Sequence, residues 1–285
     1  FDAEHAAAAQ IDSHTDFLGY ENDTLREKGK IVALYREGKT VEQLNAGEKG
    51  SVILDRTPFY AESGGQVGDQ GILQINDQLF RVQDTQKQGQ AFIHIGTMEK
   101  GSLNTGDEVQ AEVDTKRRTA TVLNHTATHL LHRILRMTLG EHVLQKGSLV
   151  EPERLRFDFS HSTPISAEEL KLIEQRVNQE IRANHEAVVR ITSPADALKS
   201  GAMGLFEDKY GDEVRVIRFG DSVELCGGTH AHRSGDVGIF KITSESGVAA
   251  GVRRIEAVTG EGAFDWIEKR ETDFKQKIQQ ADDKI

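Results

Sequence analysis

Two short segments, far apart in the chain, carry side chains that bind transition metals. In NHTATHLLH, His125 and His129 are four residues apart, and in ELCGGTH, His230 follows Cys226, the only cysteine, by four. Residues four apart on a helix lie on one face, so both imidazoles can reach one ion. A thiolate with imidazoles suits Zn²⁺, and we expect the two glycines of CGGTH to bend the backbone so that its ends meet. The sequence therefore predicts a tetrahedral zinc site with these four ligands.

The residues around this site leave its role open. Four protein ligands are typical of a structural zinc, because a catalytic zinc usually keeps one position open. The polar side chains of Thr128 and Gln145 and the glycine-rich stretches SGGQVGD and SGVAAGVRR favour chemistry instead. A zinc peptidase is disfavoured, since the histidine pair lacks the glutamate of H-E-x-x-H. We expect His132 to pack beside the site and His232 to lie at the surface.

The elements that must position these residues follow from the spacing of the apolar side chains. Leucines and isoleucines at helical spacing predict a helix over residues 119–139 that ends at Gly140. The segment SAEE predicts a second helix from about Ser166 to Asn184. Strand-like runs favour an α+β domain with helices on a mostly antiparallel sheet: RLRFDFS, AVVRIT, EVRVIRFG, SVELCGG, VGIFKITSE and VRRIEAVTG.

The chain outside this domain has two other patterns. Residues 30–114 alternate short apolar runs with turn residues, which predicts a small β-barrel. After residue 260, apolar residues at three- and four-residue spacing indicate the start of a coiled coil or an ordinary helix packing one face on the domain. The expected domains are the end of a helical region with a linker, the barrel, the zinc-containing domain and the start of the C-terminal helix, at 1–20, 21–115, 116–260 and 261–285.

Composition narrows the classes of partner. A formal net charge of −11 argues against a general nucleic-acid binder, because affinity for phosphate comes from Lys and Arg. Residues 115–160 hold eight basic and four acidic residues, which fits selective docking of a structured RNA or a solvated charged surface. A single cysteine fits a reducing cytoplasm, and the absence of a signal sequence or long apolar run predicts a soluble protein. A first residue other than Met suggests part of a longer protein.

Several segments together resemble the editing half of bacterial alanyl-tRNA synthetases and the free-standing AlaX editing proteins. They are TPFYAESGGQVGDQG, NHTATHLLH, VLQKGSLV, RLRFDFSH, VELCGGTH and ESGVAAGVRRIEAVTG. The two metal-binding segments alone would also fit the editing domain of threonyl-tRNA synthetase, but GGQ and AAGVRRIEAVTG favour the alanine type. The ends of the chain resemble flanking tRNA-binding and oligomerising regions, and the class II aminoacylation core is expected to be absent.

This resemblance implies hydrolysis of tRNA(Ala) mischarged with serine or glycine. It implies Zn²⁺ on the four residues above, the aminoacyl 3′ end of tRNA(Ala) as partner, and oligomerisation through the C-terminal helix in the longer protein. It assigns catalytic roles to Thr128 and Gln145, a serine-reading role to Thr57 and a tRNA-side role to Arg253. We expect the turn at residues 63–66 to face the zinc cleft, where its backbone N–H groups would stabilise an oxyanion, with substrate contacts from Gly64, Gly65 and Gln66.

A different class of function stays open from the sequence. The closed set of four ligands also fits a zinc-stabilised module that binds tRNA or oligomerises without catalysis. Hydrolysis of Ser-tRNA(Ala) by the chain separates the two.

Overall fold

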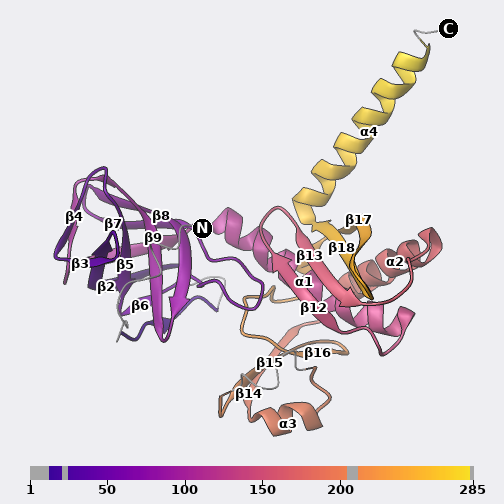
Figure 1. Cartoon of the computed structure of the whole chain (residues 1–285), viewed down its shortest axis with the longest axis horizontal. Coiled ribbons are helices and arrows are strands. Elements are labelled where there is room, and N and C mark those ends of the chain that lie inside the picture. The colour runs from indigo at the N-terminus through magenta and orange to yellow at the C-terminus, as the bar shows by residue number, and fades with distance from the viewer. Residues whose placement is uncertain (1–12, 21–24, 204–210, 283–285) are drawn as a thin grey trace. The chain divides into compact units, whose positions relative to one another are not determined.

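The computed structural model describes residues 13–20, 25–203 and 211–282 (Figure 1). The helix expected over the first ten residues lies outside these ranges. The chain divides into two compact units, residues 1–119 and 120–285, each described below by itself. Helices and antiparallel sheets both occur, so the predicted α+β class is confirmed. No helix within the described ranges has the length and apolar character needed to cross a bilayer.

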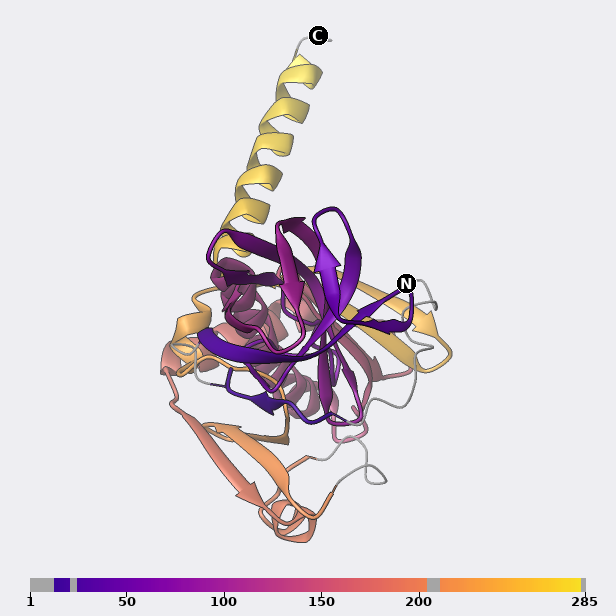
Figure 2. The same ribbon diagram turned by 90° about the vertical axis from the view of Figure 1, so that its left-hand side faces the viewer.

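The first unit is a closed β-barrel, as the alternating pattern predicts. Six antiparallel strands pair in the order β2-β5-β9-β8-β7-β11, and β11 pairs back with β2 (Figure 2). Closure leaves no free edge among the six strands. In chain order they are β2 (Arg26–Arg36), β5 (Lys49–Leu54), β7 (Gly71–Ile75), β8 (Gln78–Gln88), β9 (Ala91–Lys100) and β11 (Glu108–Val113).

Short strands surround this barrel and apolar side chains fill it. The core includes Leu34, Leu54, Phe80 and Met98, all fully buried. An extra strand extends the sheet beyond β2, and two further pairs of short strands flank it. These strands are β3 (Lys39–Val41), β4 (Gln43–Asn45) with β10 (Ser102–Asn104), and β1 (Asp16–Phe17) with β6 (Arg56–Thr57).

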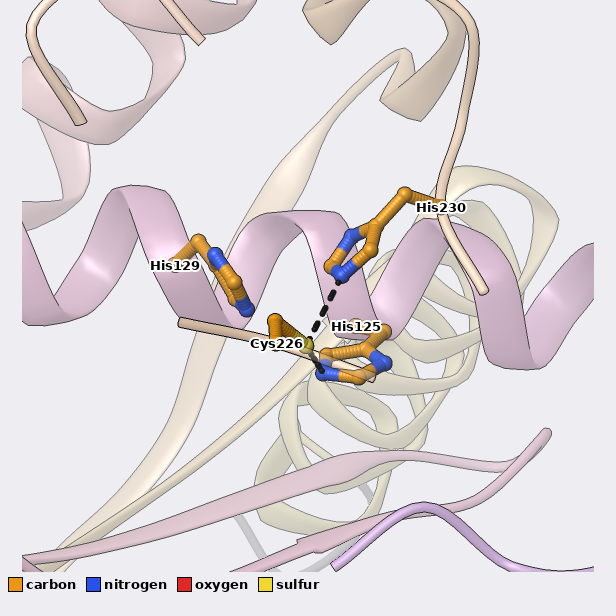
Figure 3. Close-up of side chains that lie close together, drawn as sticks. All are labelled: His125, His129, Cys226 and His230. Carbon is orange, nitrogen blue, oxygen red and sulfur yellow. Dashed lines mark hydrogen bonds between the residues drawn. The ribbon is translucent and has the colours of Figure 1, made fainter. Parts of the chain in front are cut away.

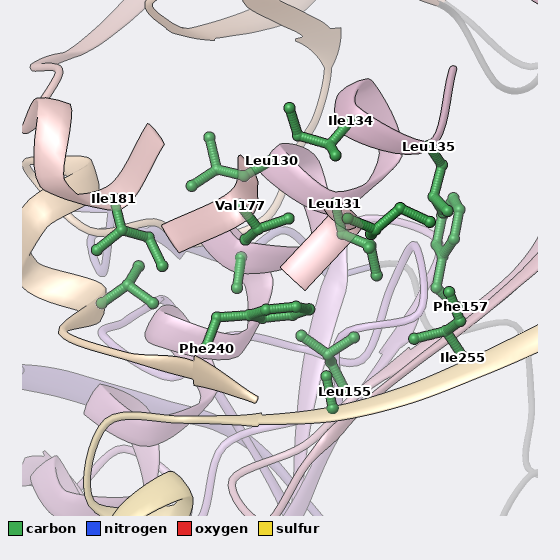
Figure 4. Packing of buried hydrophobic residues seen from close by; sticks show 14 of the residues in the cluster. Leu130, Leu131, Ile134, Leu135, Leu155, Phe157, Val177, Ile181, Phe240 and Ile255 are labelled. Atoms are coloured by element: carbon green, nitrogen blue, oxygen red, sulfur yellow. The ribbon is translucent and has the colours of Figure 1, made fainter. Parts of the chain in front are cut away.

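The second unit contains a four-stranded antiparallel sheet whose inner face packs on two helices. Figure 4 shows this core, where leucines and isoleucines of the helices meet Phe157, Phe240 and Ile255 of the sheet. The strands are, in sheet order, β12 (Gln145–Val150), β13 (Leu155–Ser160), β18 (Val252–Thr259) and β17 (Phe240–Ala249). The helices are α1 (Thr115–Leu139) and α2 (Ala167–Ala183).

Both predicted helices form, and their ends have local causes. The α1 helix begins four residues earlier than expected, because the Asp114 carboxylate accepts the backbone N–H of Arg117. It ends before Gly140, whose φ of 122° lies in the region that glycine tolerates. At α2, Ser166 and Glu169 form the capping box that SAEE predicts.

A separate sheet in the same unit was not predicted, since the strand-like runs were assigned to one sheet. It contains β14 (Ala187–Thr192), β15 (Val214–Phe219) and β16 (Ser222–Leu225), all antiparallel, with the short helix α3 (Pro194–Lys199) against it. A 3₁₀ turn, η3 (Ser234–Val237), then leads to β17. Alternation shows that a segment is a strand but not which strands it joins, so periodicity could not separate the sheets.

The chain continues from β18 into the predicted long helix, α4 (Gly260–Asp282). Figure 1 shows most of its length extending away from the strands of its own unit. Phe264, Ile267, Phe274 and Ile278, which form the predicted apolar stripe, are exposed. The coiled-coil interpretation therefore stays a prediction.

Candidate metal centre

The predicted histidine pair lies on one face of α1. His125 and His129 are both buried, and their ring centroids are 5.2 Å apart. The spacing of four residues places them one above the other, as a helix requires. His230 lies 4.2 Å from His125 and 4.5 Å from His129 by ring centroids. Three imidazoles from two distant segments therefore converge.

The second segment begins where β16 ends. The backbone N–H of Cys226 donates to the Arg215 carbonyl on β15, which keeps the cysteine in line with the sheet. The Arg215 guanidinium donates to the carbonyl oxygens of Cys226 and Gly228, both at 3.0 Å. Neither Gly227 nor Gly228 has a positive φ, and Cys226 and His230 converge as expected. Arg215 also holds this turn.

The four predicted donors form one cluster that could hold a metal ion. The Cys226 sulfur lies 3.4 Å from Nε2 of His125 and 3.3 Å from Nε2 of His230 (Figure 3). One donor atom from each residue, His129 included, lies within 4.8 Å of all the others. Bonds of about 2.0–2.3 Å around a tetrahedral zinc place its ligands roughly 3.4–3.8 Å apart. Spacing and donor chemistry therefore both fit Zn²⁺.

Two buried side chains that the sequence did not single out lie beside these imidazoles. Thr126 Oγ1 lies 3.1 Å from Nδ1 of His230 and accepts the backbone N–H of Ala231. The carboxylate of Glu224 lies 3.6 Å from Nδ1 of His129 and 3.1 Å from Nδ1 of His132. For His129 and His230 the neighbouring oxygen lies near Nδ1, which leaves their Nε2 atoms for the cluster. His132 lies beside the site, outside the four-donor cluster.

The electrostatics of the cluster favour a thiolate. Burial acts to raise the pKa of Cys226, but the imidazoles of His125, His230 and His129 outweigh it and hold that pKa well below its usual range. Burial acts to lower the pKa of His129, whereas Glu224 and Cys226 raise it to about 9. Burial, followed by the charge of His125, lowers the pKa of His230. Without metal, the cluster is therefore a thiolate beside an imidazolium.

Two family models match parts of this chain, and one of them includes the second segment of the cluster. Residues 214–256, which include Cys226 and His230, match the family described as "Threonyl and Alanyl tRNA synthetase second additional domain". Residues 1–117 match the family described as "tRNA synthetases class II (A)".

Several alanine–tRNA ligases are similar to nearly the whole chain. The chain is 56% identical over 275 residues to that of Nitrosococcus oceani, covering 95% of the chain and 31% of the relative. It is 58% identical over 256 residues to the alanine–tRNA ligase of Halorhodospira halophila, and the match covers 90% of the chain and 29% of the relative. It is 53% identical over 276 residues to the alanine–tRNA ligase of Coxiella burnetii, and the match covers 96% of the chain and 32% of the relative. The chain belongs to the alanyl-tRNA synthetase family. It spans about a third of the length of these relatives.

The two residues that the alanyl-tRNA synthetase resemblance assigned to catalysis lie in the unit that holds the cluster. Thr128 is buried on α1, and its hydroxyl donates to the Asn124 carbonyl at 2.8 Å, within the helix. Gln145 begins β12, is partly buried, and its side-chain amide donates to Ser148 at 3.3 Å. Of the two threonines, Thr126 contacts a predicted ligand, whereas the hydroxyl of Thr128 is bonded to its own helix. Both catalytic roles stay predictions.

Arg253, which the alanyl-tRNA synthetase resemblance placed on the tRNA side, is on β18. Its Nε lies 2.5 Å from a carboxylate oxygen of Glu245 on β17, and both side chains are largely buried. An arginine already paired with a carboxylate carries little free charge toward a phosphate. The tRNA-side role stays a prediction.

The four remaining predicted residues belong to the barrel unit. Thr57 is fully buried, lies 2.7 Å from Nε2 of His94 and accepts the backbone N–H of Phe59. Gly64 and Gly65 have φ of 61° and 90°, so the turn between Ser63 and Gln66 has a backbone conformation that favours glycine. Gln66 is also fully buried. That this turn faces the zinc cleft stays a prediction.

Several of the eight basic residues between positions 115 and 160 are buried or form ion pairs. Arg118 is 1% exposed and forms an ion pair with buried Asp69. Arg133 pairs with Asp221, and Arg154 pairs with two carboxylates. Several of the eight basic residues are therefore neutralised rather than gathered on a bare face.

The positions of Glu224 and Thr126 in the sequence could have indicated their place beside the cluster. Glu224 stands two residues before Cys226, and alternate residues of an extended segment project to the same side. Thr126 directly follows the first histidine. A carboxylate and a hydroxyl next to metal ligands are typical partners for the second ring nitrogen of a histidine.

Proposed function

We propose that this chain carries a zinc-containing site that hydrolyses tRNA(Ala) mischarged with serine or glycine. The observation that carries the proposal is the buried convergence of His125, His129, Cys226 and His230 from two distant segments. The identity of 53–58% to alanine–tRNA ligases supports tRNA(Ala) as the partner.

Selection of a small amino acid explains the need for a second site. A pocket that fits alanine also admits glycine, and it gains little against serine, which adds only a hydroxyl. A separate site that hydrogen-bonds the serine hydroxyl can reject alanine strongly, because alanine would leave its buried polar groups unpaired. Hydrolysis at such a site corrects the errors of the first.

Different residues of the chain would have different roles in the hydrolysis of the ester. When bound, zinc supplies a positive charge that holds the aminoacyl group and polarises its ester carbonyl. Glu224 and Thr126 keep the imidazoles of His129 and His230 turned toward the cluster. The Gln145 amide is proposed to orient the attacking water, whose oxygen bonds to the ester carbon as the bond to the ribose oxygen breaks. That ribose oxygen gains a proton, which frees the amino acid.

A non-catalytic zinc-stabilised module, for tRNA binding or oligomerisation, is the second candidate. Two observations favour it: four protein donors fill all positions of a tetrahedral ion, and the Thr128 hydroxyl is bonded to Asn124. Such a module would bind tRNA in a zinc-dependent way and leave the ester intact.

A deacylation assay separates the candidates. Zinc-loaded chain is mixed with tRNA(Ala) carrying labelled serine, glycine or alanine, and release of each amino acid is followed. We expect release of serine and glycine with alanine spared, loss of activity on chelation, and recovery when zinc is restored. Zinc-dependent binding of tRNA with all three esters intact would contradict the proposal and favour the non-catalytic module.

A further inference from the structure

A buried carboxylate lies directly behind the four-donor cluster. Glu224, the third residue of β16, is only 3% exposed, and its two oxygens face two different imidazoles. One oxygen lies 3.1 Å from Nδ1 of His132 and the other 3.6 Å from Nδ1 of His129. An ionised carboxylate is costly to bury unless hydrogen-bond donors surround it, so this arrangement requires an explanation.

The register of β16 against α1 explains how the two side chains meet. Glu224 and Cys226 are two residues apart in an extended segment, so they project to the same side with a rise of about 6.6 Å. His125 and His129 are four residues apart on a helix, with a rise of about 6 Å. These two rises are nearly equal, so Cys226 can lie beside His125 while Glu224 lies beside His129.

A buried ring nitrogen without a hydrogen-bond partner in the described part of the chain indicates the role of the Glu224 carboxylate. Among the described residues, Nδ1 of His129 is buried with no hydrogen-bond partner, and the nearest carboxylate oxygen is that of Glu224. Figure 3 shows the other ring nitrogen of His129 turned toward Cys226. A proton on Nδ1 directed at Glu224 leaves the Nε2 lone pair for a metal. His132, 2% exposed, adds a second contact that fixes the carboxylate.

We propose that Glu224 is a positioning residue that fixes the tautomer and ring orientation of His129, with His132 holding the carboxylate in place. This inference rests on the proposed zinc site. A glutamine at this position has nearly the same shape but presents an NH₂ group to one of the two Nδ1–H donors. One imidazole must then move its proton to Nε2, which removes a metal-binding lone pair if that imidazole is His129.

The test compares Co²⁺ binding by the wild type, Glu224→Gln and Glu224→Asp, with Glu174→Gln as the matched control. Glu174 is a partly buried carboxylate of the same unit, which binds Lys241 and the backbone of Ile242. We expect Glu224→Gln to weaken Co²⁺ binding roughly 10–100-fold and to change the thiolate-to-cobalt absorption band. Glu224→Asp keeps the charge and should recover part of the loss, and Glu174→Gln should match the wild type.

A second measurement needs no variant. In zinc-loaded wild type, long-range ¹⁵N–¹H spectra identify which ring nitrogen carries the proton, and we expect Nδ1–H at both His129 and His132. Wild-type cobalt affinity in Glu224→Gln, or a bare Nδ1 at His129, would overturn the role of Glu224 and leave the zinc site standing. A wild type that binds neither ion would instead contradict the zinc site, and this inference with it.

Discussion

Buried histidines occur in both units of the chain, and they are satisfied in different ways. In the barrel, His94 is fully buried, with Nδ1 2.9 Å from the Val52 carbonyl and Nε2 2.7 Å from the Thr57 hydroxyl. In the second unit, the Nε2 atoms of His125 and His230 approach one thiolate instead. Burial is therefore common to both regions, whereas among the described residues such donor atoms converge only in the second unit.

The direction in which the ring nitrogens point therefore distinguishes a metal centre from a buried histidine that serves packing. Burial lowers the pKa of His94 to about 4, with the Val52 carbonyl acting weakly against it, so that imidazole is neutral and serves packing. At the cluster, Glu224 and Cys226 outweigh burial at His129 and raise its pKa. A histidine whose nitrogens both have protein partners has none left for a metal.

The largest expected effect comes from Cys226→Ala. This change removes the only thiolate, so we expect loss of stoichiometric zinc and a fall in Ser-tRNA(Ala) hydrolysis of at least roughly 100-fold. The fold should survive, because the unit has an extensive apolar core besides the metal. Metal analysis, deacylation and circular dichroism are measured together. Wild-type editing by this variant would separate the metal from the chemistry, and unfolding would favour a structural zinc.

The converse change is His94→Ala in the barrel. It leaves a cavity and an unpaired Thr57 hydroxyl, and we expect a loss of about 3 kcal/mol in the free energy of unfolding. Zinc per chain should stay at one, because His94 is no part of the cluster. Urea denaturation and metal analysis on the same sample check this. A loss of zinc in this variant would break the distinction between the two regions.

Acid should affect the barrel through the same residue. The unfolded chain protonates His94 near pH 6.5, whereas the folded barrel resists until about pH 4. The unfolded state therefore binds more protons between these values, and stability falls as the pH drops from 6.5 toward 4. The shift corresponds to about 3 kcal/mol in total and roughly 2 kcal/mol at pH 5. Urea midpoints of wild type and His94→Ala, compared at pH 7.5 and 5, should differ less at the lower pH.

The smallest effect is expected at Gln145→Ala. Gln145 donates to Ser148 and stands outside the four-donor set, so zinc should stay bound while the hydrolysis rate falls about 10-fold. Single-turnover deacylation with parallel metal analysis measures both quantities. Ser148→Ala is the matched control, since it removes the same hydrogen bond and keeps the amide. Equal losses in the two variants would assign the effect to strand geometry rather than to water.

Local pattern predicted much of the fold. The barrel, the helix that carries His125 and the capping box at Ser166 all follow from spacings within a few residues. The separate sheet β14-β15-β16 could not be predicted, because alternation does not say which strands pair. Helix α1 also begins earlier than apolar periodicity indicates, because Asp114 caps it.

In the candidate site too, local spacing predicts some features, whereas others depend on how distant segments pack. His125, His129, Cys226 and His230 converge as their spacing predicts, because each pair is fixed by local geometry. The partners of the ring nitrogens depend on how β16 lies along α1, a relation between distant segments. Glu224 was missed for that reason, and so was Arg215, which donates to the carbonyl oxygens of Cys226 and Gly228.

X-ray absorption at the zinc edge can identify the ligands of the bound ion. The chain is loaded with one equivalent of zinc, and the nearest neighbours of the ion are identified by element and distance. We predict one sulfur at about 2.3 Å and three nitrogens at about 2.0–2.1 Å. A neighbour shell without sulfur would contradict it, since Cys226 supplies the only thiolate in the chain.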